Sequence, residues 1–441
     1  MFKRKIYNKL LEWKKREGET ALLIEGARRV GKTTLVKEFA QNEYKSYALI
    51  DFHNTSKNIL SLFDDYWDID LFFLKLQQEL NVELYERNSC IVFDEVQLCP
   101  KARQAIKTLV EDGRYDYIET GSLISIHQNV KDILIPSEEQ RIKLYPLDYE
   151  EFLLATGKDT SFKYTLDIAK KYKKIGEKAV RTELERFRLY MLIGGMPQAI
   201  KTYLSTNNLA RVDQVKREIL NLYQQDFRKI DKTGNLTRLF NAIPAQLNSN
   251  AKRYQTNAVI KDTNKDKQLS YIAELQDSQT VLVSAMVNDP NIGLSNMTNL
   301  NNYKLYLADT GLFVTLMFWD SDYTDNVVYN QLLHNKLSAN LGYLYENIVA
   351  QMLTAKGGKL FYWTQFNTST RRNYEVDFVL SRKNKICPIE VKSSSYKTHK
   401  SLDVFSQKYR ERILNKYVVI PKDISYDNDV TYIPPFLIPY I

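Results

Sequence analysis

The stretch GARRVGKTT, residues 26–34, has the residue types and the spacing of a phosphate-binding loop. It fits the pattern G-x-x-x-x-G-K-[ST], with an apolar run before it and a helical pattern after it. Its glycines permit a backbone whose N–H groups surround phosphate oxygens at the positive end of the following helix. We expect Lys32 to reach the β and γ phosphates of a nucleoside triphosphate and Thr33 to bind Mg²⁺. The predicted binding set is Gly26, Ala27, Arg28, Arg29, Val30, Gly31, Lys32, Thr33 and Thr34.

The run IVFDE, residues 91–95, predicts the other side of the same site. Its apolar residues are typical of a buried parallel strand, which would carry Asp94 and Glu95 to the edge of the sheet where ligands bind. We expect Asp94 to bind Mg²⁺, directly or through water, and Glu95 to polarise the attacking water. In the later strand pattern YIETGS, Thr120 or Ser122 is a candidate for contacting the γ-phosphate, although small polar residues are also ordinary caps of strand ends.

A hairpin is predicted for EVDFVLSRKNKICPIEVKSS, residues 375–394. In an antiparallel hairpin, the residue numbers of any two paired residues add up to the same value. A loop of two or four residues centred between Lys383 and Asn384 therefore places Asp377 opposite Glu390. The alternation of side chains along strands predicts an ionic side with Asp377, Glu390 and Lys392. The core side is expected to carry Val376, Phe378, Leu380, Ile389 and Val391.

Two opposed carboxylates destabilise a sheet unless a cation or a proton lies between them. Asp377 and Glu390 are therefore predicted to bind Mg²⁺ or Mn²⁺, while Lys392 orients a water or stabilises charge on a phosphodiester. Glu346, in the helical pattern before the hairpin, is available as a further acidic residue. The alternative interpretation is a solvated ionic face on which Lys392 alone neutralises the pair.

The elements that must position these residues divide the chain into four parts. Strands alternate with helices over residues 1–150, which predicts a parallel α/β sheet. Residues 151–234 have the pattern of a helical extension interrupted by the turn IGGMPQAI, and residues 235–334 have short helices before strands, the order of a winged helix. Residues 335–441 begin with a helix and continue through strands, which predicts a last α/β domain.

The composition is that of a soluble globular protein, with 44% hydrophobic and 26% charged residues among 441. A net charge of +9 permits a polyanionic partner, and the segments SRKNK, VKSSSYKTHK and QKYRER are locally basic. The 3 cysteines and 4 histidines lack the spacing of a zinc site. Because no signal-peptide pattern and no run that could span a bilayer is evident, we expect a cytoplasmic protein without a membrane partner.

Nine motifs occur in order over nearly the whole chain: GARRVGKTTL, FDEVQ, TGS, LYPLDYEEFL, GGMPQAI, LYLADTGL, YLYENIV, EVDFVL and PIEVKSS. In these motifs the sequence resembles prokaryotic AAA-type ATPases that join a P-loop ATPase domain to a C-terminal region with a restriction-endonuclease-like core. The resemblance implies an ATPase core of the additional-strand type, a winged-helix middle and a nuclease-like end. It also implies ATP and Mg²⁺ as the ligands of the phosphate loop.

The resemblance extends to candidate catalytic residues at both ends of the chain. The pattern D-x₁₂-E-x-K of Asp377, Glu390 and Lys392, with Glu346 before it, is similar to the catalytic set of the restriction-endonuclease-like superfamily. Near the first domain's end the family often has Gly-Arg before the LYPL strand, where this chain reads SEEQRIKLYPL. Arg141 is therefore a candidate γ-phosphate sensor, and a solvated arginine at a strand start is the alternative.

Two hypotheses of different classes follow from the sequence. The first is a Mg²⁺-dependent ATPase coupled to a nuclease-like domain that acts on DNA. The second is a nucleotide-dependent switch or scaffold whose nuclease-like domain binds nucleic acid or protein without cleavage. Either hypothesis is compatible with a homo-oligomer, in which an arginine of one subunit would act on the nucleotide bound to its neighbour.

Overall fold

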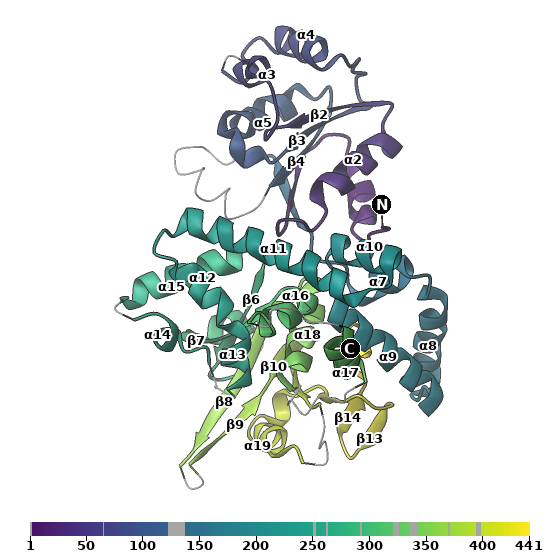
Figure 1. The fold of residues 1–441 in the computed structure, drawn as a ribbon, viewed down its shortest axis with the longest axis vertical. Helices are drawn as coiled ribbons and strands as arrows, with labels where there is room; N and C mark the ends of the chain where they lie inside the picture. The colour runs from purple at the N-terminus through teal and green to yellow at the C-terminus, as the bar shows by residue number, and fades with distance from the viewer. Residues whose placement is uncertain are drawn as a thin grey trace. The chain divides into compact units, whose positions relative to one another are not determined.

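The computed structural model of the chain describes residues 2–64, 66–121, 137–249, 253–261, 263–291, 293–320, 326–334, 342–368, 371–393 and 398–441. Its elements belong to two units (Figure 1). The first comprises Met1–Tyr145 and Asp277–Gln279, and the second comprises Pro146–Gln276 and Thr280–Ile441.

A five-stranded parallel sheet forms the centre of the first unit. Its strands are β1 (Ala21–Glu25), β2 (Ser46–Asp51), β3 (Ser89–Asp94), β4 (Asp116–Gly121) and β5 (Glu139–Lys143). The helices are α1 (Tyr7–Lys14), α2 (Lys32–Glu43), α3 (Lys57–Leu62), α4 (Ile69–Leu80), α5 (Pro100–Asp112) and the 3-10 turn η1 (Val96–Leu98). The order β2-β3-β4-β1-β5 places β4 between β1 and β3, which confirms the predicted parallel sheet and its additional strand.

Hydrophobic clusters lie on both faces of this sheet. Leu22 and Ile24 of β1 pack in one cluster with apolar residues of α1 and α2. Ala21 and Leu23, the alternate residues of the same strand, pack in the other cluster with residues of α3, α4 and α5. Because helices cover both faces, every residue of β1 and of β3 is buried, and the polar residues of these strands are confined to their ends.

Helices form much of the second unit. The helices before its strands are α7 (Tyr149–Ala155), α8 (Asp159–Tyr172), α9 (Glu177–Ile193), α10 (Pro197–Thr206), α11 (Leu209–Ile230), α12 (Asn235–Asn241), α13 (Ile243–Asn248), α14 (Thr256–Val259) and α15 (Lys265–Asp277). Later helices are α16 (Thr310–Met317), α17 (Asn326–Leu333), α18 (Gly342–Ala355) and α19 (Lys400–Lys408), with 3-10 turns η2 (Leu294–Met297), η3 (Arg410–Arg412) and η4 (Pro435–Tyr440). Helix α7 begins at a capping box, in which Asp148 and Glu151 satisfy each other's backbone N–H groups.

Two sheets complete the second unit. One has the order β7-β6-β8-β9 and contains β6 (Val281–Val287), β7 (Thr298–Leu307), β8 (Leu360–Asn367) and β9 (Arg372–Val376). The other has the order β10-β11-β12-β14-β13 and contains β10 (Phe378–Arg382), β11 (Lys385–Val391), β12 (Lys416–Val419), β13 (Ser425–Asp427) and β14 (Val430–Ile433). Because β6 pairs with β8, strands from both sides of residue 334 belong to one sheet, and the boundary expected there does not fall between two sheets.

The turn after α9 joins two other segments of the second unit. The N–H of Leu147 donates to the carbonyl of Gly195 at 2.8 Å, and the N–H of Gly195 donates to the carboxylate of Asp309 at 2.6 Å. Asp309 also accepts from the N–H of Leu312 at 2.9 Å and so caps α16. A Cβ on Gly195 would collide with the backbone of Leu147, so the close approach requires glycine. The motifs LYPL, GGMPQAI and LADTGL therefore meet at one junction.

Helix α18 contacts the same region through two buried amides. Gln351 accepts from the N–H and the hydroxyl of Thr310, at 2.8 and 2.7 Å, and donates to the hydroxyl of Tyr190 at 3.0 Å. Asn347 accepts from the N–H of Leu307 at 2.8 Å and donates to its carbonyl at 3.1 Å. The motif YLYENIV thus pairs with backbone groups at the end of β7, a contact that satisfies polar groups within the interior.

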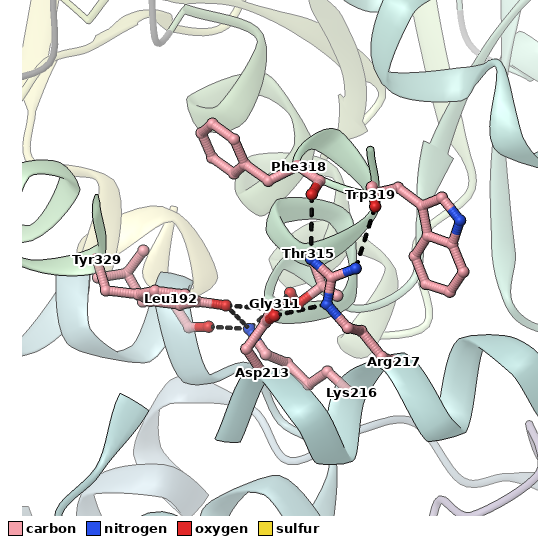
Figure 2. Close-up of polar contacts among 9 residues, drawn as sticks. All are labelled: Leu192, Asp213, Lys216, Arg217, Gly311, Thr315, Phe318, Trp319 and Tyr329. Atoms are coloured by element: carbon pink, nitrogen blue, oxygen red, sulfur yellow. Dashed lines mark hydrogen bonds and ion pairs between the residues drawn. The ribbon is translucent and has the colours of Figure 1, made fainter. Parts of the chain in front are cut away.

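Figure 2 shows a buried lysine of α11 at the centre of a polar network. Lys216 is fully buried, and its ammonium donates to the carbonyls of Leu192 and Gly311, at 2.7 and 3.1 Å, and to the hydroxyl of Tyr329 at 3.2 Å. The hydroxyl of Tyr329 in turn donates to the carboxylate of Asp213. One charged side chain thereby contacts the end of α9, the start of α16 and a residue of α17.

The neighbouring charges on α11 bind the other end of α16 (Figure 2). Asp213 accepts from the hydroxyl of Thr315 at 2.7 Å and from Arg217 at 2.8 Å. Arg217 donates to the carbonyls of Phe318 and Trp319, each at 3.1 Å, where α16 ends. A guanidinium satisfies orphan carbonyls at a helix C-terminus and interacts favourably with the helix dipole. Helix α11 therefore fixes α16 at both ends.

We expect the buried lysine to make stability depend on pH. Burial lowers the pKa of Lys216 to about 8, so above that pH the unfolded chain binds a proton that the folded chain releases. The free energy of unfolding should therefore rise with pH between about 8 and 10, by at most about 1.4 kcal/mol per pH unit. Lys216→Met removes this contribution, so urea unfolding of the variant should show a shallower rise than the wild type. Lys201→Met, at an exposed position, is the matched control. Equal slopes in all three proteins would contradict the prediction.

Candidate functional site

Residues 26–31 form the predicted phosphate-binding loop between β1 and α2. Gly31 has φ of 101°, a conformation that glycine adopts without strain, and it immediately precedes the helix. A Cβ on Gly26 would lie 2.6 Å from the carbonyl oxygen of Leu144, so glycine is required there by space rather than by its own dihedrals. The N-terminal N–H groups of α2 follow the loop directly and are available to an anion.

Lys32 is the first residue of α2, directly after this loop. It is 5% exposed, and its ammonium donates to the carbonyls of Gly26 and Ala27 at 3.0 and 3.3 Å. Burial lowers the pKa of Lys32, and the carboxylates of Glu95 and Asp94 oppose this shift. An ammonium that is bonded to neutral carbonyls can exchange them for phosphate oxygens, which are stronger partners for a cation.

Three side chains converge at the ends of β3, β4 and α2. The hydroxyl of Thr33 donates to Oδ1 of Asp94 at 3.0 Å, and the hydroxyl of Thr120 donates to the same oxygen. Burial raises the pKa of Asp94, although both hydroxyl bonds oppose the shift. A hydroxyl and a carboxylate that meet in this way are hard oxygen ligands of the kind that Mg²⁺ binds, so the residues present fit the predicted ion.

Glu95 is placed by its neighbours in the chain and in the sheet. Its backbone is left-handed, with φ of 57°, and its N–H donates to the hydroxyl of Thr120 at 3.2 Å. Its carboxylate accepts a hydrogen bond from the side-chain amide of Gln97. Gln97, which ends the motif FDEVQ, is a residue of the site that was not predicted from the sequence. Thr120 therefore contacts both acidic residues, while Ser122 lies outside the described residues.

Arg141, the candidate phosphate sensor, lies on β5 among carboxylates of its own sheet. Its guanidinium is 2.7 Å from Glu139 and 3.9 Å from Glu25, and its side chain is 39% exposed. Burial raises the pKa of Glu25, and Arg141 opposes that rise. Since Glu25 directly precedes Gly26, Arg141 is near the start of the phosphate loop, and its role as a sensor stays a prediction.

The C-terminal hairpin has the register that the sum of the residue numbers predicts. Phe378 pairs with Ile389, and the ladder closes on a two-residue turn. The turn residues Lys383 and Asn384 have φ of 44° and 60°, as a tight hairpin turn with left-handed residues requires. The shorter of the two loops considered is therefore the one that forms.

The side-chain alternation expected across Asp377 is wrong. Strand β9 ends at Val376 and β10 begins at Phe378, so the chain passes from one sheet to the other at Asp377. In consequence Val376 packs in a cluster with Val379 and Ile386, rather than sharing a side with Phe378. Period-two alternation holds only within one continuous strand, and the bend at Asp377 interrupts it.

The two predicted metal-binding carboxylates are buried close to this bend. Asp377 and Glu390 are 8% and 4% exposed. Asp377 accepts from the N–H of Val391 at 2.7 Å, and Glu390 forms an ion pair with Lys392 at 2.6 Å. Burial raises the pKa of Asp377 well above its usual range, and the negative charge of Glu346 adds to the rise. The solvated face considered as an alternative is therefore wrong, because both acids are in the interior.

A lysine that the sequence analysis missed binds the remaining acids. Lys304 of β7 is 4% exposed and forms ion pairs with Glu346 at 3.3 Å and Glu375 at 2.5 Å. Although burial opposes it, the charge of Glu346 contributes to raising the pKa of Lys304 well above its usual range. The hydroxyl of Tyr306 also donates to Glu346 at 3.3 Å. A lysine inside the otherwise apolar strand pattern YKLYLA was the available signal.

The predicted Mg²⁺ or Mn²⁺ site at the hairpin does not fit this arrangement. Within the described ranges, no group of three or more His, Cys, Asp or Glu side chains is placed to bind a metal ion. Lysine ammonium groups already lie against Glu346, Glu375 and Glu390. The structure thus brings the predicted residues together, but as a lysine–carboxylate cluster.

Comparisons with protein families divide the chain into three matched segments. Residues 18–153 match a family described as an AAA domain. Residues 184–323 match a domain of unknown function, DUF8612, and residues 341–436 match another, DUF4143. Together with the loop and the sheet, the first match identifies the N-terminal unit as an AAA-type P-loop domain and supports ATP as its ligand. Comparison with curated proteins finds no match.

Similar solved structures share little sequence with this chain. PCH-2 of C. elegans is 14% identical with a TM-score of 0.23, over 38% of this chain and 49% of that one, so the chain spans about half its length. Cdc6p of Pyrobaculum aerophilum is 14% identical with a TM-score of 0.23, over 75% and 93%. Protein VC1899 of Vibrio cholerae is 10% identical with a TM-score of 0.18, over 95% of each chain. TM-scores this low do not establish a shared fold.

The helices within the described ranges include none that combines the length and the apolar character needed to cross a bilayer.

We expect Thr120 to support catalysis through Asp94 and Glu95. Thr120→Val keeps the side-chain shape but removes the hydroxyl that contacts both acidic residues. Turnover of ATP should fall by about 10- to 100-fold, in the range that follows loss of a group that positions catalytic residues. Thr120→Ser retains the hydroxyl and should keep most of the activity in a phosphate-release assay. Equal turnover in the two variants would contradict the assignment.

Proposed function

We propose that the N-terminal unit binds ATP with Mg²⁺ and hydrolyses it to ADP and phosphate. The observation that carries this proposal is the contact between Thr33 and Asp94, which joins the first turn of α2 to the acidic end of β3. These are the two places from which a P-loop enzyme takes its phosphate-binding and metal-binding groups. The family match of residues 18–153 supports the same conclusion.

The chain's own residues account for the steps of hydrolysis. Backbone N–H groups of the loop and of the start of α2 donate hydrogen bonds to the phosphate oxygens, and Lys32 exchanges its two carbonyl partners for β and γ oxygens. When bound, Mg²⁺ neutralises charge on these oxygens. Glu95 accepts a hydrogen bond from a water and orients its oxygen toward the γ-phosphorus. As that O–P bond forms, the bond to the ADP oxygen breaks, and the water's proton leaves with inorganic phosphate or solvent.

We further propose that the second unit acts as the target of a nucleotide-dependent switch, and that its nuclease-like end binds DNA without cutting it. The lysine–carboxylate cluster favours this hypothesis over metal-dependent cleavage, because ammonium groups are bonded to three of its acids. The hairpin turn adds exposed cations, Arg382, Lys383 and Lys385, which suit a phosphate backbone. ATP binding and hydrolysis would then bias the binding state of this unit.

Substitutions of Lys32 and Glu95 separate ATP binding from hydrolysis. Lys32→Ala should abolish ATP turnover and weaken nucleotide binding, because the cation at the β and γ phosphates is lost. Glu95→Gln should retain ATP binding and lower turnover by about 100-fold or more, since the orienting carboxylate is neutralised. Fluorescent-nucleotide titration and phosphate release measure the two properties. Unchanged turnover in Lys32→Ala would refute the ATPase assignment.

A cleavage assay decides between the two roles of the C-terminal end. Plasmid and short DNA or RNA substrates are incubated with Mg²⁺ or Mn²⁺, with and without ATP, using wild type and Glu390→Ala. We expect no cutting under any condition, together with DNA binding that weakens as salt is raised. Metal-dependent nicking by the wild type that Glu390→Ala lacks would establish the nuclease instead.

A further inference from the structure

The position of Lys304 is set by elements far from the hairpin in the sequence. It lies in β7 opposite Ser284 of β6, so pairing of the two strands fixes its backbone. Its partners come from α18, which carries Glu346, and from β9, where Glu375 pairs with Thr364 of β8. The contact between lysine and acids therefore follows from how the sheet and the helix are assembled.

The cluster contains more acidic side chains than lysines, so the lysines alone do not neutralise it. Its acids are Glu346, Glu375, Asp377 and Glu390, and its bases are Lys304 and Lys392. One oxygen of Glu390, Oε2, is buried and has no hydrogen-bond partner in the described part of the chain. Buried charges without compensation are costly, so the site tolerates loss of a base poorly.

We propose that Lys304 is the built-in cation of this cluster, that it excludes a divalent ion, and that removing its charge turns the cluster into a Mg²⁺ or Mn²⁺ site. An ammonium has three donors and one charge at a single point, so it can bond to two carboxylates where an ion would otherwise bind both. With Lys304 in place, Glu346 and Glu375 are engaged by the lysine and are not available as ligands. This inference rests on the proposal that the C-terminal end acts without a metal, and it is independent of ATP hydrolysis.

Replacement of Lys304 by a neutral residue of similar length tests the inference. Lys304→Met leaves Glu346 and Glu375 without their cation, so Mn²⁺ should bind to about one more site per chain than in the wild type, counted by titration of the full chain without nucleotide. Mn²⁺ should also raise the melting temperature of this variant and leave that of the wild type unchanged. Lys416→Met, which removes a lysine of β12 that is paired with Asp429 in the turn between β13 and β14, is the control and should bind no additional ion.

A second comparison keeps the test decisive if Lys304→Met does not fold. Asp377→Asn with Glu390→Gln lowers the negative charge of the cluster in the presence of Lys304. If the lysine excludes the ion, this double variant and the wild type bind the same number of Mn²⁺ ions. Fewer ions in the double variant would show that the wild-type cluster binds metal beside Lys304, which overturns the inference and the metal-free proposal together. A folded Lys304→Met that binds no additional Mn²⁺, beside a metal-free wild type, overturns the inference alone.

Discussion

A cation that is buried away from water must be stabilised by hydrogen bonds or by an opposite charge. This requirement explains how three lysines of the chain are placed. Lys32, Lys216 and Lys304 are all buried, with exposures of 5%, 0% and 4%. Their partners differ in kind. Lys32 is bonded to backbone carbonyls of a loop, Lys216 to carbonyls and a hydroxyl of three helices, and Lys304 to carboxylates.

The kind of partner determines what each lysine can do. Because the partners of Lys32 are neutral carbonyls of the loop, its ammonium can exchange them for a more strongly negative group when one binds. Lys216 is bonded to groups that belong to the packing of helices, so any change of partner would disturb α9, α16 and α17 together. Lys304 already has the strongest partners that a protein supplies to an ammonium. The same residue type is thus suited to a ligand site, to a structural junction and to a neutralised cluster.

The sequence alone predicted those features whose parts are close along the chain. The phosphate loop with Lys32 and Thr33 is a single stretch of sequence. The register of the hairpin follows from the residue numbers on either side of its turn. Thr33 and Asp94 are 61 residues apart, but the pattern of strand ends was sufficient to bring them to one edge. For Lys304 no such rule applies, because its partners are 42 and 71 residues away and belong to another expected domain. The bend at Asp377 was not predicted for a related reason. Nothing in the neighbouring residues indicates that one apparent strand is divided into two strands that belong to different sheets.

The pairing of β6 with β8 has a consequence for any attempt to isolate the C-terminal segment. A fragment that begins near residue 335 would contain β8 without β6, and the row of N–H and C=O groups that β6 satisfies would face solvent. The same cut would remove Lys304 and leave Glu346 and Glu375 without their cation. Exposed strand edges invite association between chains, so such a fragment would tend to aggregate, and a soluble piece with this end intact would have to start upstream of β6.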